Sequence, residues 1–169
     1  MVILRATRKV LGLLPERDEQ AQTSDTALGD WYVNRLVIDR QPLLLMVSSI
    51  ALLPILERAQ KVKELPRRLP DFVERRLHQL GIAAPLIVAE LAAMSPVIVS
   101  KTVDASVRGI LVDFGKALPY YLRGPGDLPL RYAEDRLAET PLLTSRSYAE
   151  SFFPDRRTQE VLAAAWGQG

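Results

Sequence analysis

The first stretch of the sequence that could do chemistry is a polar alternation around Tyr32. Asp30, Tyr32 and Asn34 alternate with Trp31 and Val33 just after a glycine, and a β-strand would place the three polar side chains on one face. Such a row could line the wall of a binding pocket. The alternative is structural: Trp31 would anchor the core, Asp30 would cap the turn, and Asn34 would satisfy backbone groups. Both interpretations stay open.

A second stretch surrounds the expected start of a helix at Asp104. Lys101, Ser106 and Arg108 could supply hydrogen-bond donors there, where free backbone N–H groups and the helix dipole favour an anion. Asp104 is also a good N-cap residue, and a capping carboxylate would occupy the position that an anion needs. A small-ligand or enzymatic pocket therefore requires the two stretches to converge in space. The sequence assigns no residue a catalytic role, and enzymatic activity stays open.

The residue types most used in catalysis and metal binding are nearly absent. The chain has no cysteine and a single histidine, so disulfides and thiolate metal sites are excluded. His78 lies opposite the apolar stripe of its expected helix and is predicted to be solvated. A histidine-based triad and a zinc site are therefore disfavoured. We expect no metal and no cofactor, and the lack of cysteine fits a cytoplasmic location.

Another candidate site is the basic surface of an expected helix, around residues 58–76. Its arginines could meet the phosphates of a nucleic acid: Arg67, Arg68, Arg75 and Arg76. Acidic residues are interleaved with them, however, and Asp71 is placed to pair with Arg75 one helical turn further on. The formal net charge of the chain is only +2. A solvated face of mixed charge is the alternative interpretation.

The elements that must position these groups follow from the apolar pattern. Apolar and β-branched runs predict strands near residues 2, 31, 43 and 97, whereas 51–56 is a further strand or a short helix. Helical spacing predicts later helices, the clearest of them starting at Asp104. Runs of strands followed by runs of helices favour an α+β fold. We expect a mainly antiparallel sheet of about four to five strands with helices packed on one face.

The length of 169 residues fits a single domain over 1–169. Within it we expect a surface loop at 16–29 and a helical, proline-punctuated C-terminal part at 123–169. The longest uncharged run, Gln41 to Leu56, is interrupted by prolines and is shorter than the roughly 20 apolar residues of a membrane-spanning helix. We therefore expect no association with a membrane.

Four short motifs give the chain a family resemblance. They are Ile-Leu-Arg-x-Thr-x-Lys at 3–9, Leu-Gly-Asp-Trp-Tyr-x-Asn at 28–34, Ile-Asp-Arg with an apolar run at 38–47, and Thr-x-Asp-x-Ser-Val-x-Gly-x-x-x-Asp-Phe at 102–114. With these motifs the sequence resembles a family of small prokaryotic proteins known only as a domain of unknown function. The resemblance implies a fold class and no mechanism.

Three classes of function remain from the sequence. The leading hypothesis is a non-enzymatic module that binds a protein partner or forms a homo-oligomer, because catalytic residue types are scarce and the C-terminal part is apolar. The second is a small-ligand or enzymatic pocket between the Asp30–Asn34 strand and the Lys101–Arg108 helix start. The third is nucleic-acid binding through the basic helix.

Overall fold

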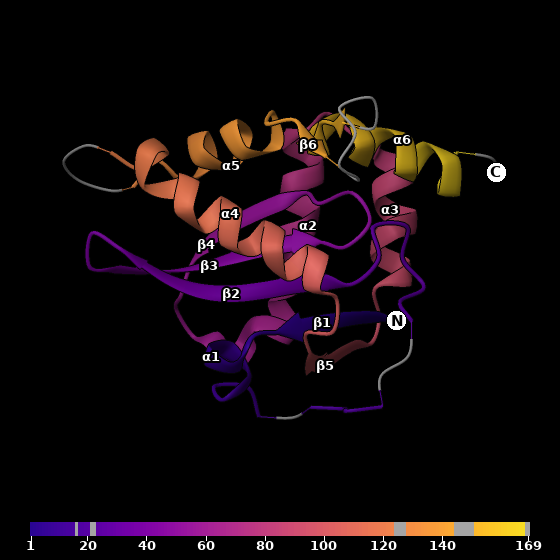
Figure 1. The fold of residues 1–169 in the computed structure, drawn as a ribbon. Helices are drawn as coiled ribbons and strands as arrows, with labels where there is room; N and C mark the ends of the chain where they lie inside the picture. The colour runs from indigo at the N-terminus through magenta and orange to yellow at the C-terminus, as the bar shows by residue number, and fades with distance from the viewer. Residues whose placement is uncertain (16, 21–22, 124–127, 144–150, 168–169) are drawn as a thin grey trace.

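The computed structural model is built around one sheet of five strands and describes residues 1–15, 17–20, 23–123, 128–143 and 151–167. Across the sheet the strands follow the order β4-β3-β2-β1-β5 (Figure 1). Their bounds are β1 (Val2–Ala6), β2 (Trp31–Ile38), β3 (Gln41–Ser48), β4 (Pro54–Arg58) and β5 (Val97–Lys101). The predicted strands near residues 2, 31, 43 and 97 are confirmed, and the open segment 51–56 leads into a strand.

The sheet is mixed but mostly antiparallel. β2, β3 and β4 form an antiparallel meander, whereas β1 lies between β2 and β5 and is parallel to both. This arrangement confirms the predicted α+β class. It also places residues that are far apart in the sequence next to each other: Arg5 of β1 is in register with Tyr32 on one side and with Ser100 on the other.

The helices connect and cover these strands. They are α1 (Arg8–Leu11), a 3-10 turn η1 (Val62–Glu64), α2 (Leu65–Gln79), α3 (Ala84–Ala93), α4 (Ala105–Tyr121), α5 (Leu130–Ala138) and α6 (Pro154–Trp166). A second, two-stranded sheet joins β6 (Leu142–Leu143) to β7 (Ser151–Phe152). The described part of the C-terminal region is thus mainly helical.

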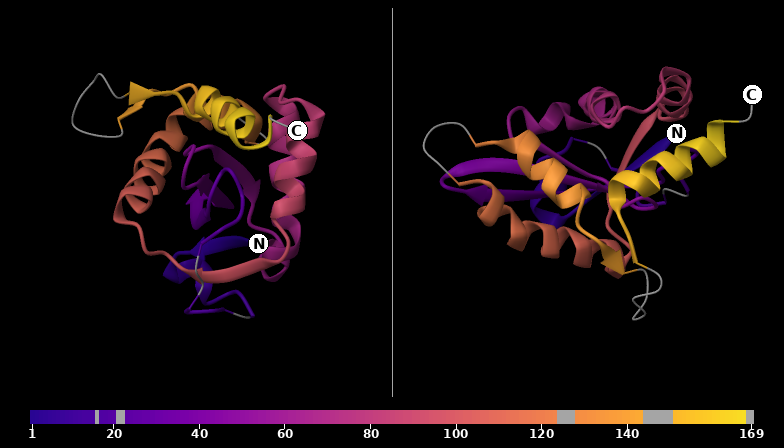
Figure 2. Two further views of the ribbon diagram at one scale, coloured as in Figure 1. Left: turned by 90° about the vertical axis from the view of Figure 1, so that its right-hand side faces the viewer. Right: turned by 90° about the horizontal axis from the view of Figure 1, so that it is seen from above.

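Helices cover both faces of the sheet, and the predicted packing on one face is wrong. Trp31 and Val33 lie in a core with α2 and α3, whereas Tyr32 and Leu45 lie in a second core with α4 and α5. Figure 2 shows α4 on one side of the sheet and α3 on the other. The physical reason is the continuous apolar run of β3, whose residues from Leu43 to Ser48 are all buried. A strand that is apolar on both faces needs cover on both faces.

The predicted surface loop 16–29 divides into an exposed part and a buried end. Residues 17–20 are exposed, but Thr26 and Leu28 are buried. Glu90 of α3 explains the change: its carboxylate is fully buried and accepts hydrogen bonds from the N–H groups of Ala27 and Leu28, at 2.9 and 3.0 Å. It also accepts one from the indole of Trp166, at 2.7 Å. Residues 16 and 21–22 of this loop, and 124–127, 144–150 and 168–169 of the C-terminal part, lie outside the described residues.

Candidate functional site

The sheet topology brings the two polar stretches of the sequence together. β5 ends at Lys101 and leads into α4, while β2 begins at Trp31, and β1 separates these two strands by a single position in the sheet. The phenol oxygen of Tyr32 accepts a hydrogen bond from the backbone N–H of Asp104, at 3.1 Å. The convergence that a pocket requires is therefore present at this point.

Asp104 caps α4 as its sequence predicts. Its Oδ1 accepts hydrogen bonds from the N–H groups of Ser106, at 2.8 Å, and of Val107, at 3.4 Å. These bonds satisfy two of the N–H groups that a helix start leaves without a partner. The carboxylate of Asp104 therefore occupies this helix terminus.

Asp30 is held by partners on two sides. Its Oδ2 accepts a hydrogen bond from Nε of Arg5 at 2.8 Å, and its Oδ1 accepts one from the hydroxyl of Ser24 at 2.6 Å. The ion pair is well shielded, with side chains 7% and 17% exposed. Arg5 also donates to the carbonyl of Lys101 at 3.3 Å. A single buried arginine of the first motif thus ties the second motif to the end of β5, directly before the fourth motif.

A pocket of about 260 Å³ opens where these groups meet, and we call it the motif pocket. It is lined by Thr23, Ser24, Gly29, Asp30, Tyr32, Ser49, Ile50, Val103 and Asp104. Its lining offers hydroxyl and carboxylate oxygens, and two aliphatic side chains, Ile50 and Val103, are 42% and 58% exposed. Most of the accessible lining is apolar, and a few convergent polar groups on such a lining are typical of a small-ligand pocket.

Gly29 is required by the geometry of this pocket. Its φ of +78° lies in the left-handed region that favours glycine. A Cβ atom at this position would also clash with the hydroxyl of Ser49 and the side chain of Ile50. Ser49 itself accepts a hydrogen bond from the N–H of Asp30, at 2.9 Å. The glycine therefore lets the 48–50 turn approach the start of β2.

Only part of the predicted ligand site lines the motif pocket. Asp30 and Tyr32 lie in its wall, whereas Asn34 lies further along β2 and accepts a hydrogen bond from the hydroxyl of Thr7, at 2.7 Å. The side chains of three further predicted residues are exposed and outside the lining: Lys101, Ser106 and Arg108.

Several residues of the site were not predicted from the sequence as binding residues. Asp104 is interpretable there only as a cap, Ser49 only as part of a turn, and Ser24 only as part of a polar loop. Arg5 does lie in the first motif, so the clustering of polar residues within shared motifs was the one available signal.

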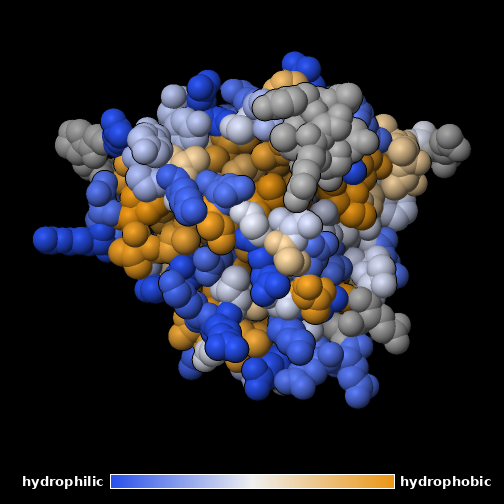
Figure 3. All heavy atoms as spheres, viewed as in Figure 1, coloured by the Kyte–Doolittle hydropathy of each residue, from blue (hydrophilic) through white to orange (hydrophobic). Residues whose placement is uncertain are grey.

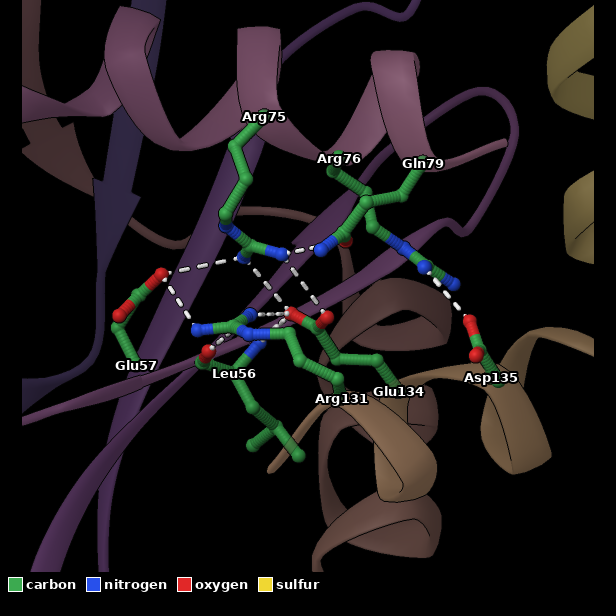
Figure 4. A network of polar contacts seen from close by, with 8 residues as sticks. All are labelled: Leu56, Glu57, Arg75, Arg76, Gln79, Arg131, Glu134 and Asp135. Atoms are coloured by element: carbon green, nitrogen blue, oxygen red, sulfur yellow. Dashed lines mark hydrogen bonds and ion pairs between the residues drawn. The ribbon is translucent and has the colours of Figure 1, made fainter. Parts of the chain in front are cut away.

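The basic helix α2 directs two of its four predicted arginines inward (Figure 4). Arg75 pairs with Glu57 at 3.1 Å and with Glu134 at 2.9 Å, in place of the predicted partner Asp71. Arg76 is 1% exposed and donates to Asp135 at 2.8 Å. Arg75 thus contacts β4 and α5, and Arg76 contacts α5, so both guanidinium groups are engaged in contacts within the protein.

The other two predicted arginines remain nearer the surface. Arg67 pairs with Glu64 at 3.2 Å, and Arg68 lies over the ring of Phe72, 4.8 Å from its centroid. Such exposed ion pairs contribute little to stability.

Glu134 and Arg131 of α5 close the edge of the sheet at β4. Glu134 is fully buried and accepts a hydrogen bond from the N–H of Leu56 at 2.7 Å, while Arg131 donates to the carbonyl of Leu56 at 3.1 Å. Arg131 and Glu134 are also paired with each other at 2.7 Å. The two side chains thus satisfy a donor and an acceptor that a further strand would otherwise take.

No helix in the described ranges is long and apolar enough to cross a membrane. The same part of the chain contains no cluster of three or more histidine, aspartate or glutamate residues able to hold a metal ion.

Comparison with known protein families gives a match over most of the chain. The family model of a domain of unknown function, DUF6933, matches residues 3–157. The matched range contains all four motifs and every residue of the motif pocket. No curated protein matches the chain.

Proposed function

The chain belongs to the DUF6933 family, and from the geometry of its motif pocket we propose that it binds a small polar molecule there. One observation carries the proposal: Asp30 and Tyr32 of the second motif meet Asp104 of the fourth motif at this pocket, and Arg5 of the first motif holds Asp30 in place. A core needs apolar residues for packing, but it does not need these polar groups to converge on a hollow. A binding site does.

The free hydrogen-bonding capacity of the pocket indicates the class of ligand. The hydroxyls of Tyr32 and Ser49 each accept a backbone N–H, and among the described residues no acceptor takes their own hydrogens. Asp104 uses Oδ1 for its cap and keeps Oδ2 without a described partner. A molecule with hydroxyl or amino groups matches these donors and acceptors, since it can both donate and accept.

The size of the pocket restricts the ligand further. At about 260 Å³ it is just below the usual range of ligand pockets, which is roughly 300–1,000 Å³. Ile50 and Val103 would cover the carbon atoms of such a ligand. We therefore expect a compound the size of an amino acid, a simple amine or a monosaccharide.

Asp30 has a positioning role in this site. Both of its carboxylate oxygens accept hydrogen bonds, from Arg5 and from Ser24, which fix the orientation of the carboxylate. The hydroxyl of Ser24 in turn accepts the N–H of Ile3, at 2.9 Å. These contacts hold the wall of the pocket in place.

A thermal-shift screen with amino acids, amines, polyols and monosaccharides tests the proposal. A ligand at a hundred times its Kd stabilises a protein by about 2.7 kcal/mol, which raises Tm by about 5–10 °C for a domain of this length. Tyr32→Phe should abolish the shift, because it removes the hydroxyl in the pocket.

Tyr120→Phe is the matched control, since Tyr120 is 69% exposed on α4 and outside the pocket. A ligand that stabilises Tyr32→Phe as much as the unmodified chain would place its site elsewhere. A screen in which no compound shifts Tm would leave the proposal without support and count as its failure.

Protein interaction is the second candidate function, and a difference between the two sheet edges favours it. The β4 edge is closed at Leu56 by side chains of α5. Along β5, the described loop residues contribute one backbone hydrogen bond, from Asp18 to the carbonyl of Val99 at 2.7 Å. An edge with open backbone groups can accept a strand from another chain. Light scattering tests self-association: a dimer indicates a second copy, whereas a monomer excludes it and leaves only a different protein as partner. A strict monomer that retains no partner in a pull-down would contradict the interaction function.

A further inference from the structure

A groove runs beside the outer edge of β5, and we call it the β5 groove. It consists of two adjoining hollows of about 310 and 430 Å³, which share Pro66, Arg67 and Val97. The first is completed by the 15–18 loop and η1, and the second by α2 and the end of α3. The other lining residues are Pro15, Arg17, Asp18, Lys63, Ile98 and Val99 in the first, and Pro70, Leu91, Met94 and Ser95 in the second.

The walls of the groove are apolar, but its charges are mainly positive. Arg17, Lys63 and Arg67 line it, against a single carboxylate from Asp18. The acidic partners of Arg17 and Arg67, at 3.9 and 3.2 Å, form ion pairs that are exposed to solvent and therefore weak. An acidic ligand fits this charge. On the face that carries α4, Figure 3 shows mostly hydrophilic residues over the lower part, toward α1 and β5.

The outer side of β5 offers backbone hydrogen-bonding groups to a ligand in the groove. On the inner side, Val2 donates to the carbonyl of Pro96, and on the outer side Asp18 donates to the carbonyl of Val99. Backbone groups of a strand alternate between its two sides, so the N–H and C=O of Val97 point outward with those of Val99. No described residue outside the strand bonds to Val97. An extended segment could pair with it, as in strand addition.

We propose that the β5 groove binds an extended acidic segment of a partner protein, whose alternate apolar side chains enter the two hollows. This inference rests on the second candidate function and is independent of the motif pocket. A second copy of the chain is a poor occupant, because pairing β5 with β5 would bring two sets of Arg17, Lys63 and Lys101 together. A nucleic acid is also disfavoured, since the lining contains no aromatic side chain for base stacking.

The test uses fluorescence anisotropy with labelled peptides on the full chain. The probe is a peptide of alternating aspartate and valine, about eight residues long, which at about 3.3 Å per residue exceeds the length of β5. One control peptide carries lysine in place of each aspartate. Another keeps the aspartates but has alternate amides N-methylated, which removes the donors needed for strand pairing. An oligouridine serves as the nucleic-acid probe.

Two charge-reversal variants locate the binding. Lys63→Glu combined with Arg67→Glu changes the groove, whereas Arg108→Glu combined with Lys116→Glu changes exposed residues of α4. The acidic peptide should bind at least about tenfold more tightly than the lysine peptide, and the groove variant should lose about tenfold, equivalent to about 1.4 kcal/mol. The α4 variant should stay within about twofold of the unmodified chain, and N-methylation should weaken binding. Circular dichroism confirms that each variant is folded.

Each result that contradicts the proposal would overturn a different part of it. Equal binding of the acidic and lysine peptides would overturn the acidic preference and leave strand addition as the function of this edge. Tighter binding of the oligouridine would replace the peptide by a nucleic acid. If neither peptide binds, or if the groove variant binds the acidic peptide as tightly as the α4 variant does, both the acidic partner and the interaction function at β5 are wrong. The Tyr32→Phe test of the motif pocket is unaffected by any of these results.

Discussion

Removing the carboxylate of Glu134 should destabilise the whole domain. Glu134 is fully buried, and its oxygens accept hydrogen bonds from Arg75, Arg131 and the N–H of Leu56. Glu134→Ala leaves two guanidinium groups with Glu57 as their shared acidic partner. It also leaves the N–H of Leu56 unpaired at the edge of β4.

The magnitude follows from these contacts. A buried N–H without a partner costs about 1–3 kcal/mol. Breaking a fully buried ion pair costs about 3–5 kcal/mol, but Arg75 and Arg131 are 26% and 39% exposed, so water relieves part of this cost. We expect a loss of about 4 kcal/mol in the free energy of unfolding, which is a large fraction of the roughly 5–15 kcal/mol of a typical domain.

Urea denaturation followed by circular dichroism measures this loss by linear extrapolation. Glu134→Gln should lose less, because its amide oxygen can still accept the N–H of Leu56. Glu139→Ala is the control: Glu139 is 57% exposed and pairs with Arg136 at 3.8 Å, so we expect a change below about 0.5 kcal/mol. A loss of less than about 1 kcal/mol for Glu134→Ala, or a larger loss for Glu134→Gln, would refute the reasoning, which assigns Glu134 the closure of this edge.

Three further substitutions test the positioning of the motif pocket. Gly29→Ala should lower the free energy of unfolding by about 1–3 kcal/mol in urea denaturation, because the φ of Gly29 is +78° and an added Cβ would meet Ser49. Gly109→Ala is the control: Gly109 lies in the open on α4, and its replacement should raise the free energy of unfolding by about 0.5–1 kcal/mol. Equal effects of the two substitutions would contradict this. Asp104→Ala should lower the free energy of unfolding by about 1 kcal/mol, and Asp104→Asn should lower it much less, since asparagine also caps helices. Equal losses in the two variants would argue against the capping role of Asp104. Glu90→Ala should release the indole of Trp166 and shift tryptophan fluorescence to longer wavelength, and an unchanged spectrum would show that Glu90 does not hold Trp166.

Local signals in the sequence were sufficient for the elements but not for their packing. The strands near residues 2, 31, 43 and 97 follow from apolar and β-branched runs, and the cap at Asp104 follows from its position before a helical pattern. The covering of both faces was missed, although the unbroken apolar run in β3 indicates it. Periodicity shows where a strand is buried only when one of its faces is polar.

Polar residues were harder to place, because their partners are distant in the sequence. Arg75 has a plausible local partner in Asp71, yet it pairs with Glu57 and Glu134. Glu90 looks like a surface residue of an ordinary helix, yet it binds the turn at Ala27 and Leu28. Neither pairing can be recognised from helical or strand periodicity in the sequence. The sequence left open whether the Asp30 and Asp104 segments meet, and the presence of Arg5, Asp30 and Asp104 in shared motifs was the only signal that linked them.

The position of β1 between β2 and β5 affects the order in which the domain can form during synthesis. The β2–β3–β4 meander is formed by strands that are close in the sequence, so it can assemble early. Strand β1, in contrast, can pair with β5 only after the chain up to Val97 and beyond has been synthesised. Contacts between such distant residues slow folding, and unpaired apolar strands promote aggregation. Strand β1 therefore gains its second neighbour only after β5 has been synthesised, and one of its edges stays without a strand partner until then.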